Sequence, residues 1–122
     1  MAKIVHFGKY YYPDRGGIES VTLNLARGAS SFGHDVTVVC FANQAHGVYE
    51  MLDGIKVLRS STLSLIASQP IGFQYLIDCF KSARKADLVH VHMPNVLAAF
   101  CALLVPPKVR LLVHWHSDII NK

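Results

Sequence analysis

The stretch "KIVHFGKYYYPDRGGIES" (Lys3–Ser20) holds a short apolar run, a loop with three consecutive tyrosines and the start of an amphipathic segment. The apolar run is typical of a buried β-strand, and the segment that begins near Ile18 has helical spacing. Gly16 and Gly17 stand directly before this helical pattern. A strand, a glycine-containing loop and a helix in this order predict the first unit of an α/β fold.

The same alternation continues along the chain. Four more runs have the composition of buried strands: Asp35–Phe41, Gly54–Ser60, Asp87–Met93 and Val109–Trp115. Helical patterns lie between them: Gly33 closes the first helix, a second runs from Phe73 past Phe80, and Asn95 caps a third. Strands joined by crossover helices predict an α/β, Rossmann-like fold, with a doubly wound parallel sheet and helices on both faces. The stretch Ser61–Gly72 is harder to assign and leaves room for one extra short strand.

Length and charge narrow the class of protein. At 122 residues the chain is long enough for one packed core, which predicts a single domain over residues 1–122. Hydrophobic residues make up 52% of the chain and charged residues 16%, which excludes a disordered chain. The formal net charge of +4 is scattered rather than gathered in a run, so no nucleic-acid partner is expected.

The cysteines and apolar runs indicate the compartment. Cys40, Cys79 and Cys101 each lie in an apolar run, which favours buried thiols in a reducing compartment over a disulfide framework or a zinc motif. The start of the chain lacks a signal-peptide pattern, and Val96–Val105, the longest apolar run, is too short to span a membrane. We therefore expect a soluble, cytoplasmic chain. Its basic, apolar composition also fits peripheral contact with the anionic inner face of a membrane.

The glycine loop is a candidate ligand site, because open parallel sheets bind ligands beyond the carboxyl ends of their strands. The backbone N–H groups of Gly16 and Gly17 can approach a ligand closely, and the helix that follows adds a partial positive charge. These features suit a diphosphate or sugar hydroxyls. The spacing differs from G-x-G-x-x-G and lacks a P-loop lysine, which disfavours nicotinamide and Walker-type nucleotide binding. A plain turn remains the alternative.

The three tyrosines, Tyr10, Tyr11 and Tyr12, have three open interpretations. They could cap the edge of the core with their hydroxyls in water, stack on a sugar ring, or lie among lipid headgroups. The sequence does not choose between these.

Four of the seven histidines form two H-x-H pairs, His90 with His92 and His114 with His116. Residues two apart on a strand share a face, so the two pairs meet if their strands are neighbours. Zinc binding, with Asp118 as a nearby carboxylate, is one interpretation. Core histidines bonded to the backbone are a second, and polar site residues a third. Two histidines on one short strand do not converge easily on one ion, so no metal is assigned. His116 is the best site candidate because it is the last residue before the chain leaves the sheet.

Five motifs in order resemble those of a known family. They are "PDRGGIES", "FGHDVTVVC", "DGIKVLR", "LVHVHMPNVLAAFCALL" and "LLVHWHSDI". Together, from about Lys3 to Ile119, they resemble the N-terminal domain of a retaining GT-B glycosyltransferase of family 4. The resemblance implies a hexosyltransferase that moves a sugar from a nucleotide-diphospho-sugar to a glycan or lipid-linked acceptor with retention. It implies no cofactor, and a role in surface polysaccharide or glycolipid synthesis.

The resemblance also implies roles for individual residues. Gly16 and Gly17 would contact the donor phosphates or sugar. His116 would hydrogen-bond the donor sugar and support the positive charge that develops at the anomeric carbon, as the catalytic residue. Glu19 would lie at the helix N-terminus without a catalytic role. The acceptor side would be lined by His92, Pro94, Asn95 and Tyr12.

One part of the family pattern is missing. Its nucleotide-binding half carries two glutamates separated by seven residues, whereas the glutamates here are Glu19 and Glu50. We therefore expect the chain to be the acceptor-side domain without the C-terminal nucleotide-binding domain, and to be inactive alone. A non-catalytic Rossmann-like module that binds an anion or a partner is the alternative from a different class.

Overall fold

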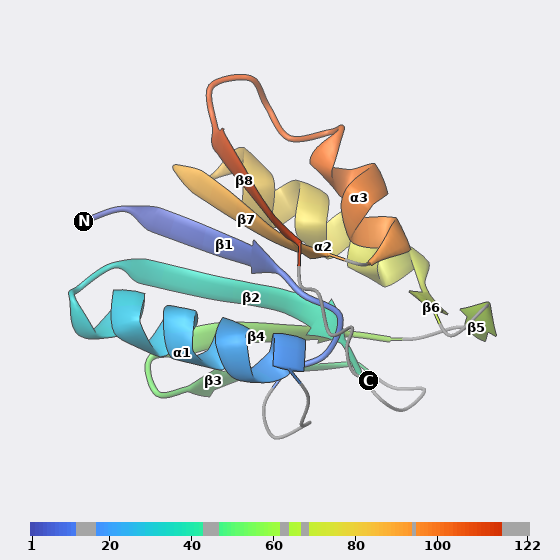
Figure 1. Ribbon diagram of the computed structural model, residues 1–122, viewed down its shortest axis with the longest axis horizontal. Coiled ribbons are helices and arrows are strands. Elements are labelled where there is room, and N and C mark those ends of the chain that lie inside the picture. The colour runs from blue at the N-terminus through green and yellow to red at the C-terminus, as the bar shows by residue number, and fades with distance from the viewer. Residues whose placement is uncertain (12–16, 43–46, 62–63, 67–68, 94, 116–122) are drawn as a thin grey trace.

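The computed structural model describes residues 1–11, 17–42, 47–61, 64–66, 69–93 and 95–115. Strands alternate with helices in the N-terminal and C-terminal parts, and five strands follow one another between the first and second described helices (Figure 1). The elements in chain order are β1 (Lys3–Phe7), α1 (Gly17–Ser31), β2 (Asp35–Phe41), β3 (Val48–Leu52), β4 (Ile55–Ser60), β5 (Ser64–Ile66), β6 (Gln69–Ile71), α2 (Phe73–Arg84), β7 (Leu88–Met93), α3 (Val96–Ala102) and β8 (Arg110–Trp115). The five predicted strands are all present, with bounds within one residue of those expected.

The main sheet confirms the predicted α/β, Rossmann-like fold. Its strand order is β3-β4-β2-β1-β7-β8, and every neighbouring pair except β3 with β4 is parallel. β1 lies in the middle, where Ile4 pairs with Val36 of β2 and with Leu88 of β7. The switch in chain direction therefore falls at β1, the strand that leads into the glycine loop.

The antiparallel strand β3 was not predicted. It joins β4 through a tight turn in which Asp53 has φ 54° and Gly54 has φ 77°. Two successive residues with positive φ are what a two-residue hairpin turn requires, and Asp-Gly is a favoured pair there. The hairpin signal was therefore present in "DGIKVLR", which the sequence analysis assigned to a strand only. β5 and β6 form a separate two-stranded sheet within the stretch that was hard to assign.

Helices cover both faces of the main sheet. α1 packs on β2 and β4, while α2 and α3 lie on the opposite face (Figure 1). The core on the α2 and α3 side centres on Phe7, Val39, Phe41, Tyr75, Cys79 and Val91, and the core on the α1 side on Tyr11, Ala26, Val36, Val38, Ile55 and Val57. All three cysteines are buried and free, as predicted.

The buried face of α2 differs from the one that its apolar pattern suggests. Tyr75, Cys79 and Ala83 face the core, whereas Phe73 is 73% exposed and Phe80 is also exposed. β8 differs too, because the sequence predicted a strand that is covered on both faces and most of its residues are exposed. Within the described residues, β7 is the element packed against β8, and no helix covers it.

The predicted helix ends are confirmed. Gly33 follows α1 with φ 88°, a backbone conformation that favours glycine. Asn95 caps α3, because its side-chain oxygen accepts a hydrogen bond of 3.2 Å from the backbone N–H of Ala98. None of the described helices has the length and apolarity needed to cross a membrane.

Candidate functional site

The carboxyl ends of the five parallel strands share one edge of the sheet, where ligands bind in open α/β folds. Gly17 is the first residue of α1 at this edge, and His92 and Asn95 lie at the end of β7 and just beyond it. The other predicted site residues, Tyr12, Gly16, Pro94 and His116, lie outside the described residues. Their roles remain predictions.

A buried hydrogen-bond group holds the chain where it leaves β1. The backbone N–H of Gly8 donates to the carbonyl oxygen of Val39 at 2.8 Å. The carbonyl oxygen of Gly8 accepts hydrogen bonds from the hydroxyl of Tyr75 at 2.9 Å and from Nδ2 of Asn95 at 3.1 Å. Burial raises the pKa of Tyr75 well above its usual value, so the phenol stays protonated and donates.

Asn95 therefore has two structural tasks. Its amide oxygen caps α3, and its amide nitrogen holds Gly8 at the start of the loop that carries Gly16 and Gly17. The side chain is buried. Asn95 thus fixes Gly8 where the chain leaves β1.

Two of the three tyrosines belong to the core. Tyr10 packs against the core on the α2 side, and Tyr11 is buried on the α1 side. Burial raises the pKa of Tyr11 to about 12, and its hydroxyl has no hydrogen-bond partner in the described part of the chain. The hydroxyl is therefore not in water, which corrects the capping interpretation for this residue. Tyr12 lies outside the described residues.

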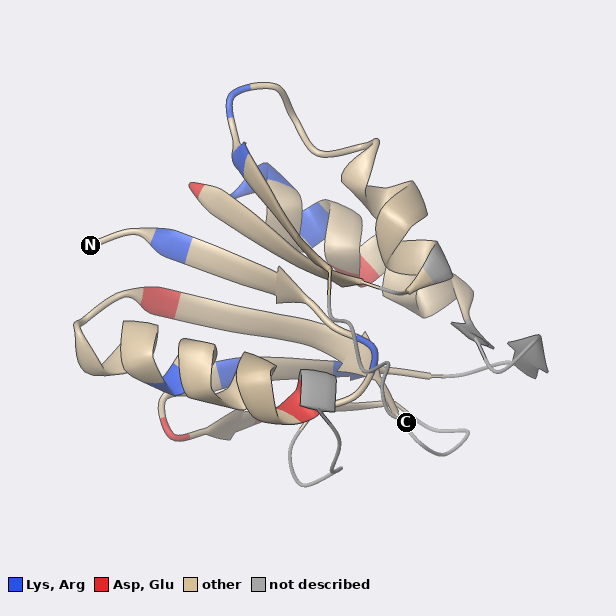
Figure 2. Cartoon of the chain, in the orientation of Figure 1, with Lys and Arg blue, Asp and Glu red and all other residues tan. Residues whose placement is uncertain are grey.

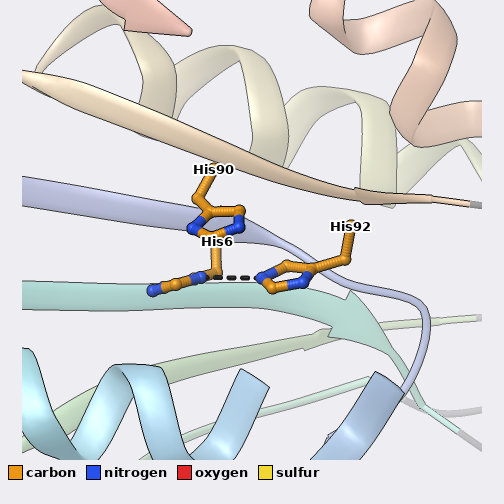
Figure 3. A group of neighbouring side chains, drawn as sticks. All are labelled: His6, His90 and His92. Atoms are coloured by element: carbon orange, nitrogen blue, oxygen red, sulfur yellow. Dashed lines mark hydrogen bonds between the residues drawn. The ribbon is translucent and has the colours of Figure 1, made fainter. Parts of the chain in front are cut away.

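β7 and β8 are neighbours, as the predicted meeting of the H-x-H pairs requires, and His92 pairs with His114 in register. His116, the other member of the second pair, lies outside the described residues. His6 of β1 joins them, since it pairs with His90. The flanking strand residues Val5, Phe7, Val89 and Val91 face the core under α2 and α3, so the histidines lie on the opposite face, the one that carries α1 (Figure 3). His6, His90 and His92 are buried and His114 is partly buried. We call these four residues the histidine cluster.

Hydrogen bonds and ring contacts link the histidine cluster. Nδ1 of His6 lies 2.9 Å from Nε2 of His92, and Nε2 of His90 lies 3.3 Å from Nδ1 of His114. The rings of His90 and His92 are stacked, with centroids 4.3 Å apart and planes 7° from parallel. Burial, and then the charge of His90, lower the pKa of His6 to about 3, so His6 is neutral at neutral pH.

One ring nitrogen from each of His6, His90 and His92 lies within 4.8 Å of the other two, a spacing that a metal ion could bridge. A metal ion must lie in the plane of each imidazole that binds it, along the nitrogen lone pair. The stacked, nearly parallel rings of His90 and His92 do not share such a point. Nδ1 of His6 and Nε2 of His92 face each other directly instead. The geometry therefore favours a hydrogen-bonded stack of imidazoles over a metal centre.

His6 was missed by the sequence analysis, which treated the H-x-H pairs alone. A single histidine in "KIVHF" carries no motif, and its partners are more than eighty residues away. The sequence feature that could have identified the face of His6 is the alternation of side chains along a strand, which puts His6 and Ile4 on the same face.

Comparisons with known proteins give one family profile and one relative. The sequence profile of Glycosyltransferase Family 4 matches residues 15–121, a range that includes every predicted site residue except Tyr12. O-antigen chain mannosyltransferase C of Escherichia coli is 28% identical over 121 residues, which make up 98% of this chain and 33% of the mannosyltransferase. The chain thus spans about a third of the length of that relative.

Proposed function

Because this chain belongs to Glycosyltransferase Family 4, we propose that it is the acceptor-side domain of a sugar-transferring enzyme. The enzyme transfers a hexosyl group from a nucleotide-diphospho-sugar to a glycan or lipid-linked acceptor, with retention at the anomeric carbon. The observation that carries the proposal is the family match, which runs from the glycine loop to the residues after β8. A role in surface polysaccharide synthesis is supported by the name of the relative, an O-antigen chain mannosyltransferase.

The proposed chemistry divides between two loops at the carboxyl edge. The backbone N–H groups of Gly16 and Gly17 bind the phosphates or the sugar of the donor substrate. They lie at the N-terminus of α1, where the helix dipole also favours negative charge. His116 hydrogen-bonds the donor sugar and stabilises the positive charge that builds at the anomeric carbon. Tyr12, Pro94, His92 and Asn95 serve the acceptor side. His92 and Asn95 do so from buried positions, behind the surface that the acceptor would contact.

We assign the nucleotide to a second domain that follows residues 1–122 in the complete enzyme. Two features support this division: the chain spans about a third of its relative, and it lacks the spaced glutamates of the family. The domain of residues 1–122 alone then has no detectable transfer activity.

A transfer assay tests the proposal. The full-length protein, incubated with a panel of nucleotide-diphospho-sugars and lipid-linked or free glycan acceptors, should produce a glycosylated acceptor. Gly17→Val should abolish transfer and leave the melting temperature nearly unchanged, because the side chain intrudes where the backbone approaches the donor. Turnover by residues 1–122 alone, or equal loss of activity and melting temperature in Gly17→Val, would contradict the proposed division of roles.

We further propose that the enzyme rests on the anionic inner face of a membrane through α2. Figure 2 shows basic residues toward the C-terminal end of this helix, where Lys81 and Arg84 lie in its last turn. Its exposed side chains include Phe73, Ile77 and Phe80, and the ring of Phe80 lies 5.6 Å from the guanidinium carbon of Arg84. Four lysines line a hollow of about 200 Å³ beside the helix: Lys3, Lys56, Lys81 and Lys85. Exposed apolar groups flanked by cations suit an anionic bilayer surface.

Vesicle sedimentation tests this contact. The protein should bind vesicles of phosphatidylcholine and phosphatidylglycerol, and binding should weaken as the salt concentration rises. The double variant Lys81→Glu/Lys85→Glu should bind weakly, whereas Lys108→Glu, an exposed lysine between α3 and β8, should bind nearly as well as the parent. Equal binding to vesicles of phosphatidylcholine alone would argue against electrostatic attachment.

A further inference from the structure

A hollow of about 360 Å³ lies at the carboxyl edge of the sheet, away from the histidine cluster. Its described lining is Gly47, Tyr49, Ser61 and Gln74. These residues come from the start of β3, the end of β4 and the first turn of α2. Because β3 runs antiparallel to β4, its first residues lie at the edge where the parallel strands end.

A buried carboxylate organises the floor of this hollow. Asp78 of α2 is buried and accepts hydrogen bonds from the hydroxyl of Tyr49 at 2.8 Å, the hydroxyl of Ser60 at 2.6 Å and the amide of Gln74 at 3.0 Å. The amide nitrogen of Gln74 also donates to the hydroxyl of Tyr49 at 3.0 Å. These bonds fix the directions of two side chains that line the hollow.

The wall of the hollow is built by a close backbone approach. A Cβ atom on Gly47 would lie 2.8 Å from the carbonyl oxygen of Arg59 and 3.1 Å from the nitrogen of Ser61. A side chain at position 47 would therefore push the strand start away from β4. The glycine keeps Tyr49 close to Gln74 across the hollow.

The hydrogen-bonding groups of the lining side chains that remain available indicate which kind of ligand fits the hollow. The amide nitrogen of Gln74 donates to Tyr49 and Asp78, which leaves its amide oxygen able to accept a hydrogen bond from a ligand hydroxyl. Tyr49 is 56% exposed, and its ring is held in place through its hydroxyl. No lysine or arginine is among the described lining residues, and the carboxylate of Asp78 lies behind them. A neutral, hydroxyl-rich ring suits this hollow better than an anion does.

We propose that this hollow is a saccharide subsite for the glycan acceptor, an assignment that rests on the proposed function. One sugar ring packs on the exposed ring of Tyr49. Its hydroxyls donate to the amide oxygen of Gln74 and exchange a hydrogen bond with Ser61. Asp78 is a positioning residue, since it reaches the sugar only through the side chains that it orients.

Direct binding to the full-length protein is the first test. Saturation-transfer NMR with mannobiose, mannotriose and chitobiose should detect binding of at least one sugar by the parent protein. Tyr49→Ala should lose that signal. Met51→Ala should keep it, because Met51 is exposed on the same strand two residues further from the carboxyl edge. Absence of binding by the parent, or an equal signal from Tyr49→Ala, would overturn the subsite.

Acceptor kinetics give an independent measurement. Tyr49→Ala should raise the KM for the acceptor about tenfold, the usual size of a lost aromatic contact, and leave the KM for the donor unchanged. Tyr49→Phe should show a smaller rise, because the ring remains. If the enzyme transfers sugar and Tyr49→Ala has a normal acceptor KM, the subsite is wrong and the proposed function stands. If the parent binds oligosaccharides at Tyr49 but transfers no sugar, the subsite stands and the proposed function is wrong.

Discussion

Nδ1 of His6 lies 2.9 Å from Nε2 of His92, so a buried hydrogen bond joins the central strand β1 to its neighbour β7. One ring must donate its N–H and the other must accept it with a lone pair. Protonation of the accepting nitrogen would place two N–H groups against each other. The bond therefore depends on at least one of the two rings staying neutral.

Acid should destabilise the protein through His6. Its pKa is about 3 in the folded chain and 6.5 when unperturbed, so the unfolded chain takes up the proton first as the pH falls. The contribution of His6 is complete above pH 6.5 and is lost as the pH falls from 6.5 toward 3. Within that window the free energy of unfolding should drop by up to about 1.4 kcal/mol per pH unit from this residue.

Urea titrations of the parent and of His6→Gln between about pH 7 and about pH 5 measure this effect. Glutamine keeps a hydrogen-bonding side chain but does not titrate. The variant should be less stable at neutral pH and show a shallower loss of stability with acid. Identical slopes would mean that His6 is not the group responsible.

Two buried tyrosines should respond oppositely to removal of their hydroxyls. Tyr75→Phe removes the donor to the carbonyl oxygen of Gly8 and should cost about 1 kcal/mol of unfolding free energy. Tyr11→Phe should be neutral or stabilising, because the Tyr11 hydroxyl is buried without a partner among the described residues. Chemical denaturation measures both, and a large loss in Tyr11→Phe would reveal a partner for that hydroxyl.

Two glycines make a second matched pair. Gly28 lies inside α1, and a Cβ there would meet nothing within 4 Å, so Gly28→Ala should stabilise the protein by about 0.5–1 kcal/mol. Gly47→Ala should destabilise it by about 1–3 kcal/mol, because its Cβ would overlap the backbone of β4. Thermal unfolding checks both signs, and a stable Gly47→Ala would show that the start of β3 moves freely.

His116→Ala in the full-length enzyme should lower kcat by about 10²–10³, the usual effect of removing one well-placed stabilising contact. Acceptor binding should persist. His114→Ala is the control, since His114 bonds to His90 and should affect stability more than the chemical step. A chelator should change neither protein, because the described rings do not converge on one ion. A His116→Ala enzyme with normal kcat would exclude the proposed catalytic role.

Local pattern predicted the parallel strands well because each is a dense apolar run bounded by polar or turn residues. β3 was not predicted because none of its residues is buried and Glu50 interrupts the apolar run "VYEML". The apolar pattern of α2 predicted the wrong buried face for a related reason. Its core side includes Asp78, whose burial depends on hydroxyl donors from β3 and β4 that no local pattern reveals.

The residues of the candidate site also differ in how far a local sequence pattern could predict them. The contact between His92 and His114 was predictable, because each belongs to an H-x-H motif near the end of a strand and the two strands are neighbours. His6 and the Tyr49–Gln74–Asp78 group are assembled by tertiary pairing alone. Each member is unremarkable in its own segment, and only the sheet order brings them together.

The central position of β1 has a consequence for how the chain is made. During synthesis β1 can pair with β2 early, but its other edge stays unpaired until β7 emerges more than eighty residues later. During that interval an apolar strand edge is open to other chains, a state that favours aggregation. The incomplete sheet must stay in solution while the segments between β2 and β7 are synthesised. Co-expression with holdase chaperones, or slower synthesis at low temperature, should therefore raise the soluble yield more than stabilising the finished fold does.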